Sequence, residues 1–334
     1  MSYPPDEAGR HSTWHPDELP DLSPGEPTAQ APTFHIPALP RKFQGRLWLH
    51  LLLFVLTLGT TTAVGAFHYH SFASEFGRID VPFGWGLLVP GLWYSLTLLT
   101  ILGAHEMGHY LFCRRYNIDA SLPYFIPAPV PLTGTLGAVI KIREAFPTRT
   151  VLFDIGVAGP IAGFAIVVPA LFLGLSMSHV VPVPVGNDVF FLGEPLLFRA
   201  GVKLVFGTIQ DGYTVNMHPM MFASWFGMLA TALNLLPFGQ LDGGHITYAT
   251  MKRLSMPISL ATVATAVVMT WFTSSWMFLT MMMIVMLFLL GPRHPRVVAE
   301  WEPLARSRYA VAVLALIILI LCFTPVPIAL VQQP

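Results

Sequence analysis

The sequence predicts an all-α polytopic membrane protein with about six to seven transmembrane helices. Of its 334 residues, 54% are hydrophobic and only 11% are charged, whereas about a quarter of the residues in a soluble domain are charged. The mean hydropathy is +0.62, and apolar runs long enough to cross a bilayer recur along the chain. The formal net charge is zero, so the composition indicates no nucleic-acid partner. Two cysteines, Cys113 and Cys322, are too few for a disulfide framework or a thiolate metal cluster.

The apolar runs divide the chain into a tail and a membrane domain. Residues 1–44 are rich in Pro, Ser, Thr, Asp and Glu, which predicts a disordered cytoplasmic tail without a cleavable signal peptide. Residues 45–334 are predicted to form one transmembrane domain, whose informative motifs fall between residues 87 and 250. The expected crossings are 47–67, 87–113, 151–178, 219–237, two within 256–290 that fold back near Thr273–Ser275, and 309–331.

Basic residues indicate the orientation of these spans. Only Arg78, Arg199 and Lys203 fall on the side opposite to the N-terminus. The other fifteen of the 18 Lys and Arg residues fall on the N-terminal side: Arg10, Arg41, Lys42, Arg46, Arg114, Arg115, Lys141, Arg143, Arg149, Lys252, Arg253, Arg293, Arg296, Arg306 and Arg308. Because basic residues are retained in the cytoplasm, we expect a cell-membrane protein whose N-terminus and second-span end face the cytoplasm.

The segment between the second and third spans is expected to be non-helical. Prolines within residues 123–129 disfavour a helix. Glycines and β-branched residues at 134–142 suit a short re-entrant strand or hairpin. Two interpretations remain open: a plain connecting loop, or an exposed strand edge that pairs with an extended substrate segment.

The second span ends in His105-Glu106-Met107-Gly108-His109. Histidines at i and i+4 lie on one helix face, so both imidazoles can reach one metal ion. A glutamate between two such histidines is the usual general base of a zinc peptidase. The alternative is a pair of satisfied core histidines beside a buried acid, but this leaves Glu106 without a named partner at membrane depth. Metal binding is therefore the preferred interpretation, and Cys113, one turn later, is expected to be an inert buried thiol.

A catalytic zinc site usually takes three protein ligands, and the end of the fourth span offers the third. Asp242 follows Pro237 and Gly239, which break the helix and let the carboxylate turn toward the second span. A solvated helix-terminal aspartate is the alternative for Asp242. His245 is a rival ligand that the spacing does not exclude.

Four further polar residues fall near these motifs or at the far membrane face. Asn234 is expected to donate a hydrogen bond to a developing oxyanion or to bridge neighbouring helices. Asp154 is interpreted as a helix N-terminal residue that complements the dipole rather than as a ligand. His68 and His70 fall at the opposite membrane face, too far from His105 to share a metal.

The pairing of H-E-x-x-H in one span with N-x-x-P-x-x-x-L-D-G-G in a later one resembles the site-2 protease family of intramembrane zinc metalloproteases, over about residues 47–296. The resemblance implies one catalytic zinc ion bound by His105, His109 and Asp242. It also implies Glu106 as the general base and Asn234 as a group that positions substrate or oxyanion. The small residues of 156–163 look like a core helix of that family and are interpreted as ordinary close packing.

Many bacterial members of that family carry a PDZ domain between the two ligand-bearing spans. Residues 179–217 are too few for such a domain, which needs roughly a hundred residues. The chain therefore looks more like the PDZ-free subgroup, which includes plant plastid and archaeal members.

The resulting hypothesis is a metalloprotease domain that hydrolyses a peptide bond in or next to the transmembrane segment of a membrane-anchored protein substrate within the lipid bilayer. One alternative is a metal-ion transporter, which predicts ionisable residues continuing toward the outer face of the same helices. Mainly Ser and Thr occur there, with His218 at the outer rim. The other alternative is an inactive client-binding homologue, which predicts a broken motif, whereas both motifs are intact.

Overall fold

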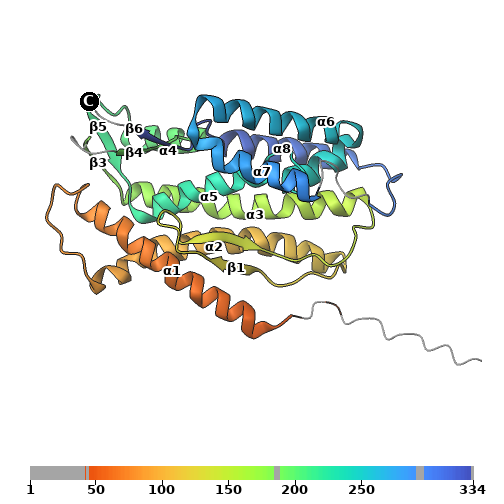
Figure 1. The fold of residues 1–334 in the computed structure, drawn as a ribbon, viewed down its shortest axis with the longest axis horizontal. Helices are drawn as coiled ribbons and strands as arrows, with labels where there is room; N and C mark the ends of the chain where they lie inside the picture. The colour runs from red at the N-terminus through yellow and green to blue at the C-terminus, as the bar shows by residue number, and fades with distance from the viewer. Residues whose placement is uncertain (1–41, 43–44, 184–188, 291–296, 332–334) are drawn as a thin grey trace, which may run out of the picture. The chain divides into compact units, whose positions relative to one another are not determined.

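The computed structural model describes residue 42 and residues 45–183, 189–290 and 297–331. These residues are mostly helical, as the composition predicts, and they form one compact unit from Arg41 onward (Figure 1). The tail expected over residues 1–44 lies outside the described residues, except for Lys42.

The described elements are eight α-helices, two 3-10 turns and six short strands. The helices are α1 (Leu47–Ala73), α2 (Leu88–Arg115), α3 (Arg149–Ser176), α4 (Leu196–Phe206), α5 (Pro219–Leu235), α6 (Asp242–Phe272), α7 (Met277–Leu290) and α8 (Arg306–Cys322). The 3-10 turns are η1 (Trp85–Leu87) and η2 (Ser274–Trp276). The strands are β1 (Tyr124–Pro127), β2 (Thr135–Val139), β3 (His179–Pro182), β4 (Val189–Leu192), β5 (Tyr213–Asn216) and β6 (Ile328–Val331).

Among the described residues, four helices are long and apolar enough to cross a membrane: α1, α2 with its preceding 3-10 turn, α3 and α6. The helices α5 and α8 have 17 residues each, and α7 has 14. At 1.5 Å per residue, 17 residues extend about 26 Å, slightly less than a typical hydrocarbon core. By length and composition alone, four of the expected six to seven crossings are therefore supported.

The long apolar run 256–290 breaks where the sequence predicts a fold-back. Helix α6 ends at Phe272, and Thr273 adopts an extended backbone whose hydroxyl accepts a hydrogen bond from the Ser275 N–H. The side chain of Trp276 is buried beside this break, and its indole N–H donates to the Pro325 carbonyl at 2.5 Å. A polar turn and a buried anchor thus separate α6 from α7.

Strands β1 and β2 form the antiparallel hairpin expected near 134–142. Its tip packs on the middle of α1, because a Cβ placed on Gly134 would lie 2.8 Å from the Thr60 carbonyl oxygen. The Tyr94 hydroxyl donates to the Thr133 carbonyl at 3.0 Å, and a ring nitrogen of His68 lies 3.2 Å from the Leu132 carbonyl. The hairpin is therefore held by contacts with both α1 and α2, and non-helical backbone inside a membrane needs such partners.

The stretch 179–217, which has no clear pattern in the sequence, is a small α/β region. Its strands β3 and β5 pair with each other, and β4 pairs with the C-terminal strand β6. Figure 1 shows these four strands together with α4 at one end of the long helices. The all-α prediction therefore holds for the helices but omits these two sheets, whose strands of four residues are too short to show a period.

Helix α3 lies at the centre of the helix packing. The main hydrophobic core joins its residues to those of α5, α6 and α8, with the Trp225 ring fully buried. Close packing of α2 on α3 depends on glycine, since a Cβ on Gly108 would lie 2.5 Å from the Ala158 carbonyl oxygen. The two helices therefore approach at backbone distance just where α2 carries its histidines.

Candidate metal centre

The imidazole rings of two histidines of α2 converge on one point. His105 and His109 are one helical turn apart and both are buried. Their Nε2 atoms lie 3.2 Å apart. Two imidazole nitrogens at this distance inside an apolar bundle indicate a shared partner between them.

Asp242 reaches these histidines from a different part of the chain. Helix α5 ends at Leu235, Gly239 takes a left-handed backbone (φ +52°), and α6 begins at Asp242 itself. One carboxylate oxygen lies 3.1 Å from His105 Nε2 and the other 3.3 Å from His109 Nε2. The turn is tight, because a Cβ on Gly243 would lie 2.0 Å from the Leu235 carbonyl oxygen. The helix-breaking residues thus do turn the carboxylate toward α2.

The donor set fits a tetrahedral zinc ion. Among the described residues, the side chains that could share a metal are His105, His109 and Asp242, with their ligand atoms all within 4.8 Å of one another. Bonds of about 2.0–2.1 Å at tetrahedral angles place ligand atoms about 3.3–3.4 Å apart. The three separations of 3.1, 3.2 and 3.3 Å are close to this value. Nitrogen and carboxylate ligands are also those that zinc prefers.

His109 is oriented by the main chain of α3. Its Nδ1 lies 2.7 Å from the Ile155 carbonyl oxygen, so Nδ1 carries the proton and donates it to this oxygen. Nε2 is thereby left with its lone pair toward Asp242 and His105. Such a hydrogen bond to the remote ring nitrogen fixes the tautomer and the ring orientation of a metal-binding histidine.

Asn234 lies next to the two histidines, whereas His245 lies away from them. The side-chain amide nitrogen of Asn234, near the end of α5, lies 3.3 Å from His105 Nε2. His245 lies outside the group of ligand atoms described above, with its Cβ against Gly156 and its ring 5.8 Å from that of Phe146. Of the two alternatives for the third ligand, Asp242 lies beside the two histidines and His245 does not.

Glu106 is buried beside the histidines and faces the hairpin. Its Oε2 accepts a hydrogen bond from the Ile140 main-chain N–H at 2.9 Å. Ile140 immediately follows β2. The carboxylate that lacked a named partner in the sequence is therefore held by the backbone at the end of a strand.

The small residues of α3 do more than pack helices. A Cβ on Gly159 would lie 2.1 Å from His109 Nε2, and one on Gly163 would lie 3.2 Å from His105 Cβ. The interpretation of residues 156–163 as ordinary close packing is thus incomplete, because these glycines leave the space that the imidazoles occupy. Their spacing of four residues was a signal available in the sequence.

Asp154 is not in the first turn of α3, so its interpretation as a residue that complements the helix dipole is wrong. Its carboxylate binds the Arg308 guanidinium and the Tyr116 hydroxyl instead. Burial and the neighbouring Asp154 raise the pKa of the Tyr116 phenol, so Tyr116 remains a hydrogen-bond donor. His70, near the end of α1, lies with its Nε2 2.8 Å from the Val81 carbonyl oxygen.

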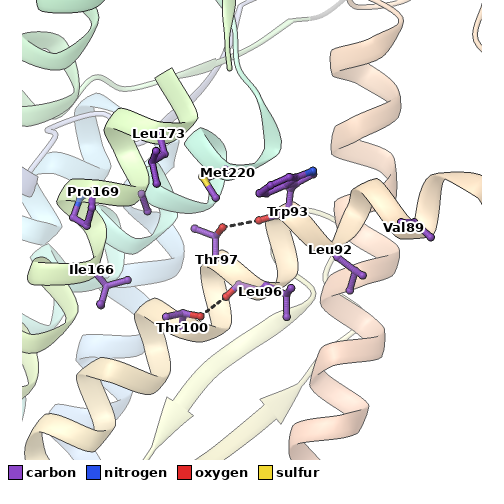
Figure 2. Close-up of a pocket in the computed structure, with 11 residues that line it drawn as sticks. Val89, Leu92, Trp93, Leu96, Thr97, Thr100, Ile166, Pro169, Leu173 and Met220 are labelled. Carbon is purple, nitrogen blue, oxygen red and sulfur yellow. Dashed lines mark hydrogen bonds between the residues drawn. The ribbon is translucent and has the colours of Figure 1, made fainter. Parts of the chain in front are cut away.

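An apolar cavity of about 570 Å³ lies between α2 and α3. Figure 2 shows its lining, in which the hydroxyls of Thr97 and Thr100 turn back to the carbonyls of Trp93 and Leu96. Its described lining contains none of the three candidate metal ligands. Its lining is predominantly apolar.

Comparison with known proteins identifies the family. The sequence model of Peptidase family M50 matches residues 93–278, which include both histidines, Glu106, Asn234 and Asp242. The chain belongs to peptidase family M50. The resemblance to the site-2 protease family is thereby confirmed.

Plant proteins are among the curated relatives of this M50 member. It is 30% identical over 168 residues to "Probable zinc metalloprotease EGY2, chloroplastic" of Arabidopsis thaliana, which covers 50% of this chain and 30% of the relative. It is 32% identical over 226 residues to "Probable zinc metalloprotease EGY1, chloroplastic" of the same plant, covering 60% and 39%. The rice protein of that name (Oryza sativa subsp. japonica) is 34% identical over 155 residues, covering 44% and 26%. The matches thus span less than half of each relative, and no solved structure matches this chain.

Proposed function

We propose that this M50 member is an intramembrane zinc metalloprotease that hydrolyses peptide bonds in or next to the transmembrane segment of membrane-anchored proteins. The observation that carries the proposal is the convergence of His105, His109 and Asp242, with Glu106 alongside, inside apolar helices. Membership of a peptidase family and the names of the plant relatives support the same conclusion.

The proposed ligands of one zinc ion are the two Nε2 atoms and the Asp242 carboxylate. When bound, the ion supplies Lewis acidity, which acidifies water and polarises a peptide carbonyl. The protein contributes the geometry: Ile155 fixes the His109 tautomer, and the start of α6 favours the negative charge of Asp242.

Glu106 and Asn234 are the proposed catalytic residues. The hydrogen bond from Ile140 holds the Glu106 carboxylate in one orientation, from which it takes a proton from water and returns one to the leaving amine. The Asn234 amide, 3.3 Å from His105 Nε2, donates an N–H to the scissile carbonyl oxygen as negative charge develops on it.

Substrate is proposed to add as a strand to β2. In the described part of the chain, β2 pairs with β1 and with no other strand. Because the N–H of Ile140 turns from this sheet toward Glu106, a chain segment lying along β2 runs beside the base. A helical substrate hides its carbonyls in hydrogen bonds, and strand pairing keeps an unwound segment open to attack.

We further propose seven crossings, made by α1, α2, α3, α5, α6, α7 and α8, within a membrane domain over residues 45–334. The contacts at the helix ends support an alternating path. Arg308, at the start of α8, binds Asp154 near the start of α3, and Trp276 binds Pro325 beyond the end of α8. Together with the basic-residue bias, this path supports our proposal that the N-terminal tail and the metal centre lie toward the cytoplasmic side of the cell membrane.

Neither alternative function has comparable support. An ion path through α2 needs polar groups directed into it, whereas Thr97 and Thr100 bond to their own helix. An inactive homologue has no need of a base, whereas Glu106 is present and held beside the metal ligands.

The decisive experiment is the Glu106→Gln variant of the full-length chain, purified in detergent and mixed with single-span test proteins. Loss of a general base lowers the rate by roughly 10²–10⁴-fold, while zinc content stays at the wild-type value because no ligand is changed. The matched control is Glu302→Gln, which alters an exposed glutamate. Cleavage by Glu106→Gln at the wild-type rate contradicts the proposal. A wild-type chain that carries zinc into liposomes but cleaves no test protein also contradicts it.

A further inference from the structure

Three side chains from three parts of the chain meet where α2 ends and where α3 and α8 begin. The Arg308 guanidinium of α8 binds both Asp154 oxygens, with Nε to Oδ1 at 2.8 Å and Nη2 to Oδ2 at 2.7 Å. The hydroxyl of Tyr116, the residue that caps the end of α2, donates to Asp154 Oδ2 at 2.5 Å. The carboxylate of α3 is thus held by α8 and by the end of the helix that carries the histidines.

The contacts within this cluster restrict the motion of its side chains. A two-pronged contact between guanidinium and carboxylate fixes the relative orientation of both groups, beyond what charge attraction alone does. The side chains of Asp154 and Arg308 are only 13% and 25% exposed, so water competes little for the contact. A third donor, Tyr116, further restricts the carboxylate.

The residue after Asp154 touches the metal centre. Ile155 gives its carbonyl to His109 Nδ1 at 2.7 Å, and its side chain is buried with Cys113 of α2. One turn along α3, Gly159 leaves room for the His109 ring. A small slide or rotation of α3 therefore changes both the hydrogen bond that orients His109 and the space its ring occupies.

We propose that Tyr116, Asp154 and Arg308 form a clamp that positions His109 for metal binding. The clamp acts through α3, because it fixes the position of Ile155 along the axis of α3 relative to the end of α2. Helix α8 supplies one member of the clamp, Arg308. Tyr116 and Asp154 lie within residues 93–278, whereas Arg308 lies beyond them, so one of the three clamp residues comes from outside the family match. The proposal rests on the proposed function only in taking His109 as a metal ligand.

The test uses the purified full-length chain with zinc and cobalt(II) as probes. Tyr116→Phe removes one hydroxyl and keeps the ring, Arg308→Lys keeps the charge without the two-pronged contact, and Asp154→Asn removes the charge. Zinc affinity is measured by competition with a chelating dye, and coordination by the visible spectrum of the cobalt form. Loss of an outer partner of a metal ligand lowers affinity about 10–100-fold. Because Asp154 acts on His109 one step further away, through Ile155, we expect a loss near the lower end of this range for Asp154→Asn, a smaller loss for Tyr116→Phe and Arg308→Lys, and a shifted cobalt spectrum in each.

A matched control separates positioning from general stability. Arg306→Lys, at an exposed arginine two residues before Arg308, is expected to keep wild-type zinc affinity and spectrum. If the clamp variants lower thermal stability but keep both wild-type zinc affinity and the wild-type cobalt spectrum, the cluster is only structural and the proposal is wrong. Tyr116→Phe keeps this test available where Asp154→Asn fails to fold.

Failure of the proposed function has a different signature. A wild-type chain that binds zinc and cobalt but cleaves no test protein contradicts the protease proposal, while the clamp is still judged by affinity and spectrum. A wild-type chain that binds neither metal contradicts both.

Discussion

The main-chain N–H of Ile140 donates a hydrogen bond to Glu106 Oε2 across 2.9 Å. A backbone group at the end of β2 therefore fixes the proposed base, and the same strand is the proposed docking edge for substrate. Base and substrate share one support, so a shift of the hairpin displaces both together.

The first prediction concerns this N–H. Ile140→Pro removes the donor and is expected to lower kcat by about 10-fold or more, since an unheld carboxylate spends less time in its productive orientation. Ile140→Ala keeps the N–H and is the control for the lost side chain. Steady-state cleavage of a test protein measures both, and equal kcat values for the two variants contradict the role assigned to the N–H.

The second prediction concerns the glycine against His109. Gly159→Ala places a methyl group 2.1 Å from His109 Nε2 in the present arrangement, so the ring must leave its position and zinc content per chain is expected to fall sharply. The control is Gly59→Ala, since a Cβ there meets nothing within 4 Å; alanine is the better helix former by about 1 kcal/mol. Metal analysis of purified protein distinguishes them, and full zinc occupancy in Gly159→Ala contradicts the geometry.

The third prediction concerns the hairpin tip. Tyr94→Phe removes the hydroxyl that donates to the Thr133 carbonyl. A buried acceptor left without a partner costs about 1–3 kcal/mol, so the free energy of unfolding is expected to fall by that amount. Tyr213→Phe, at a tyrosine that is 47% exposed, is the control. The measurement is thermal unfolding in detergent. Equal melting temperatures for the two variants contradict a supporting role for Tyr94.

The fourth prediction concerns acid sensitivity at the start of α5. His218 Nδ1 accepts a hydrogen bond from the Met220 N–H at 3.3 Å, which requires a neutral ring. Burial lowers the pKa of His218 to about 4, from an unfolded value of 6.5. Between these values the unfolded chain binds more protons, so this contribution to stability is complete above pH 6.5 and is lost as the pH falls through about 4.

The measurement is the melting temperature as a function of pH. His218→Asn keeps a side chain able to cap a helix but does not titrate, so its melting temperature is expected to fall less than that of the wild type between pH 6.5 and 4. Parallel curves for the two proteins contradict the assignment to His218.

Much of the candidate site could be predicted because it is local in sequence. His105 and His109 share a helix face through their spacing alone, and the residues that break the helix before Asp242 indicate a turn there. The fold-back near Thr273 follows from a run too long for one crossing. In each case a short-range rule of helix geometry is enough.

Other parts had no sequence signal. The partner of Glu106 is a main-chain N–H, which every residue except proline offers, so Ile140 is not distinguishable by type. The contact between Asp154 and Arg308 joins residues 154 positions apart, and no periodicity links them. The sequence left two roles open for Asn234, a hydrogen bond to an oxyanion or a bridge between helices. Its amide lies beside His105, which favours the role at the metal centre.

The separation of 137 positions between His105 and Asp242 has a consequence for biosynthesis. While the chain is being made, α2 enters the membrane with two of the proposed ligands and the proposed base, but the third proposed ligand follows only after α3 and α5. A nascent chain that has inserted only its first three long helices therefore lacks a complete set of ligands for tight zinc binding. Under the proposed function, hydrolysis therefore requires that the N-terminus of α6 has first docked against α2.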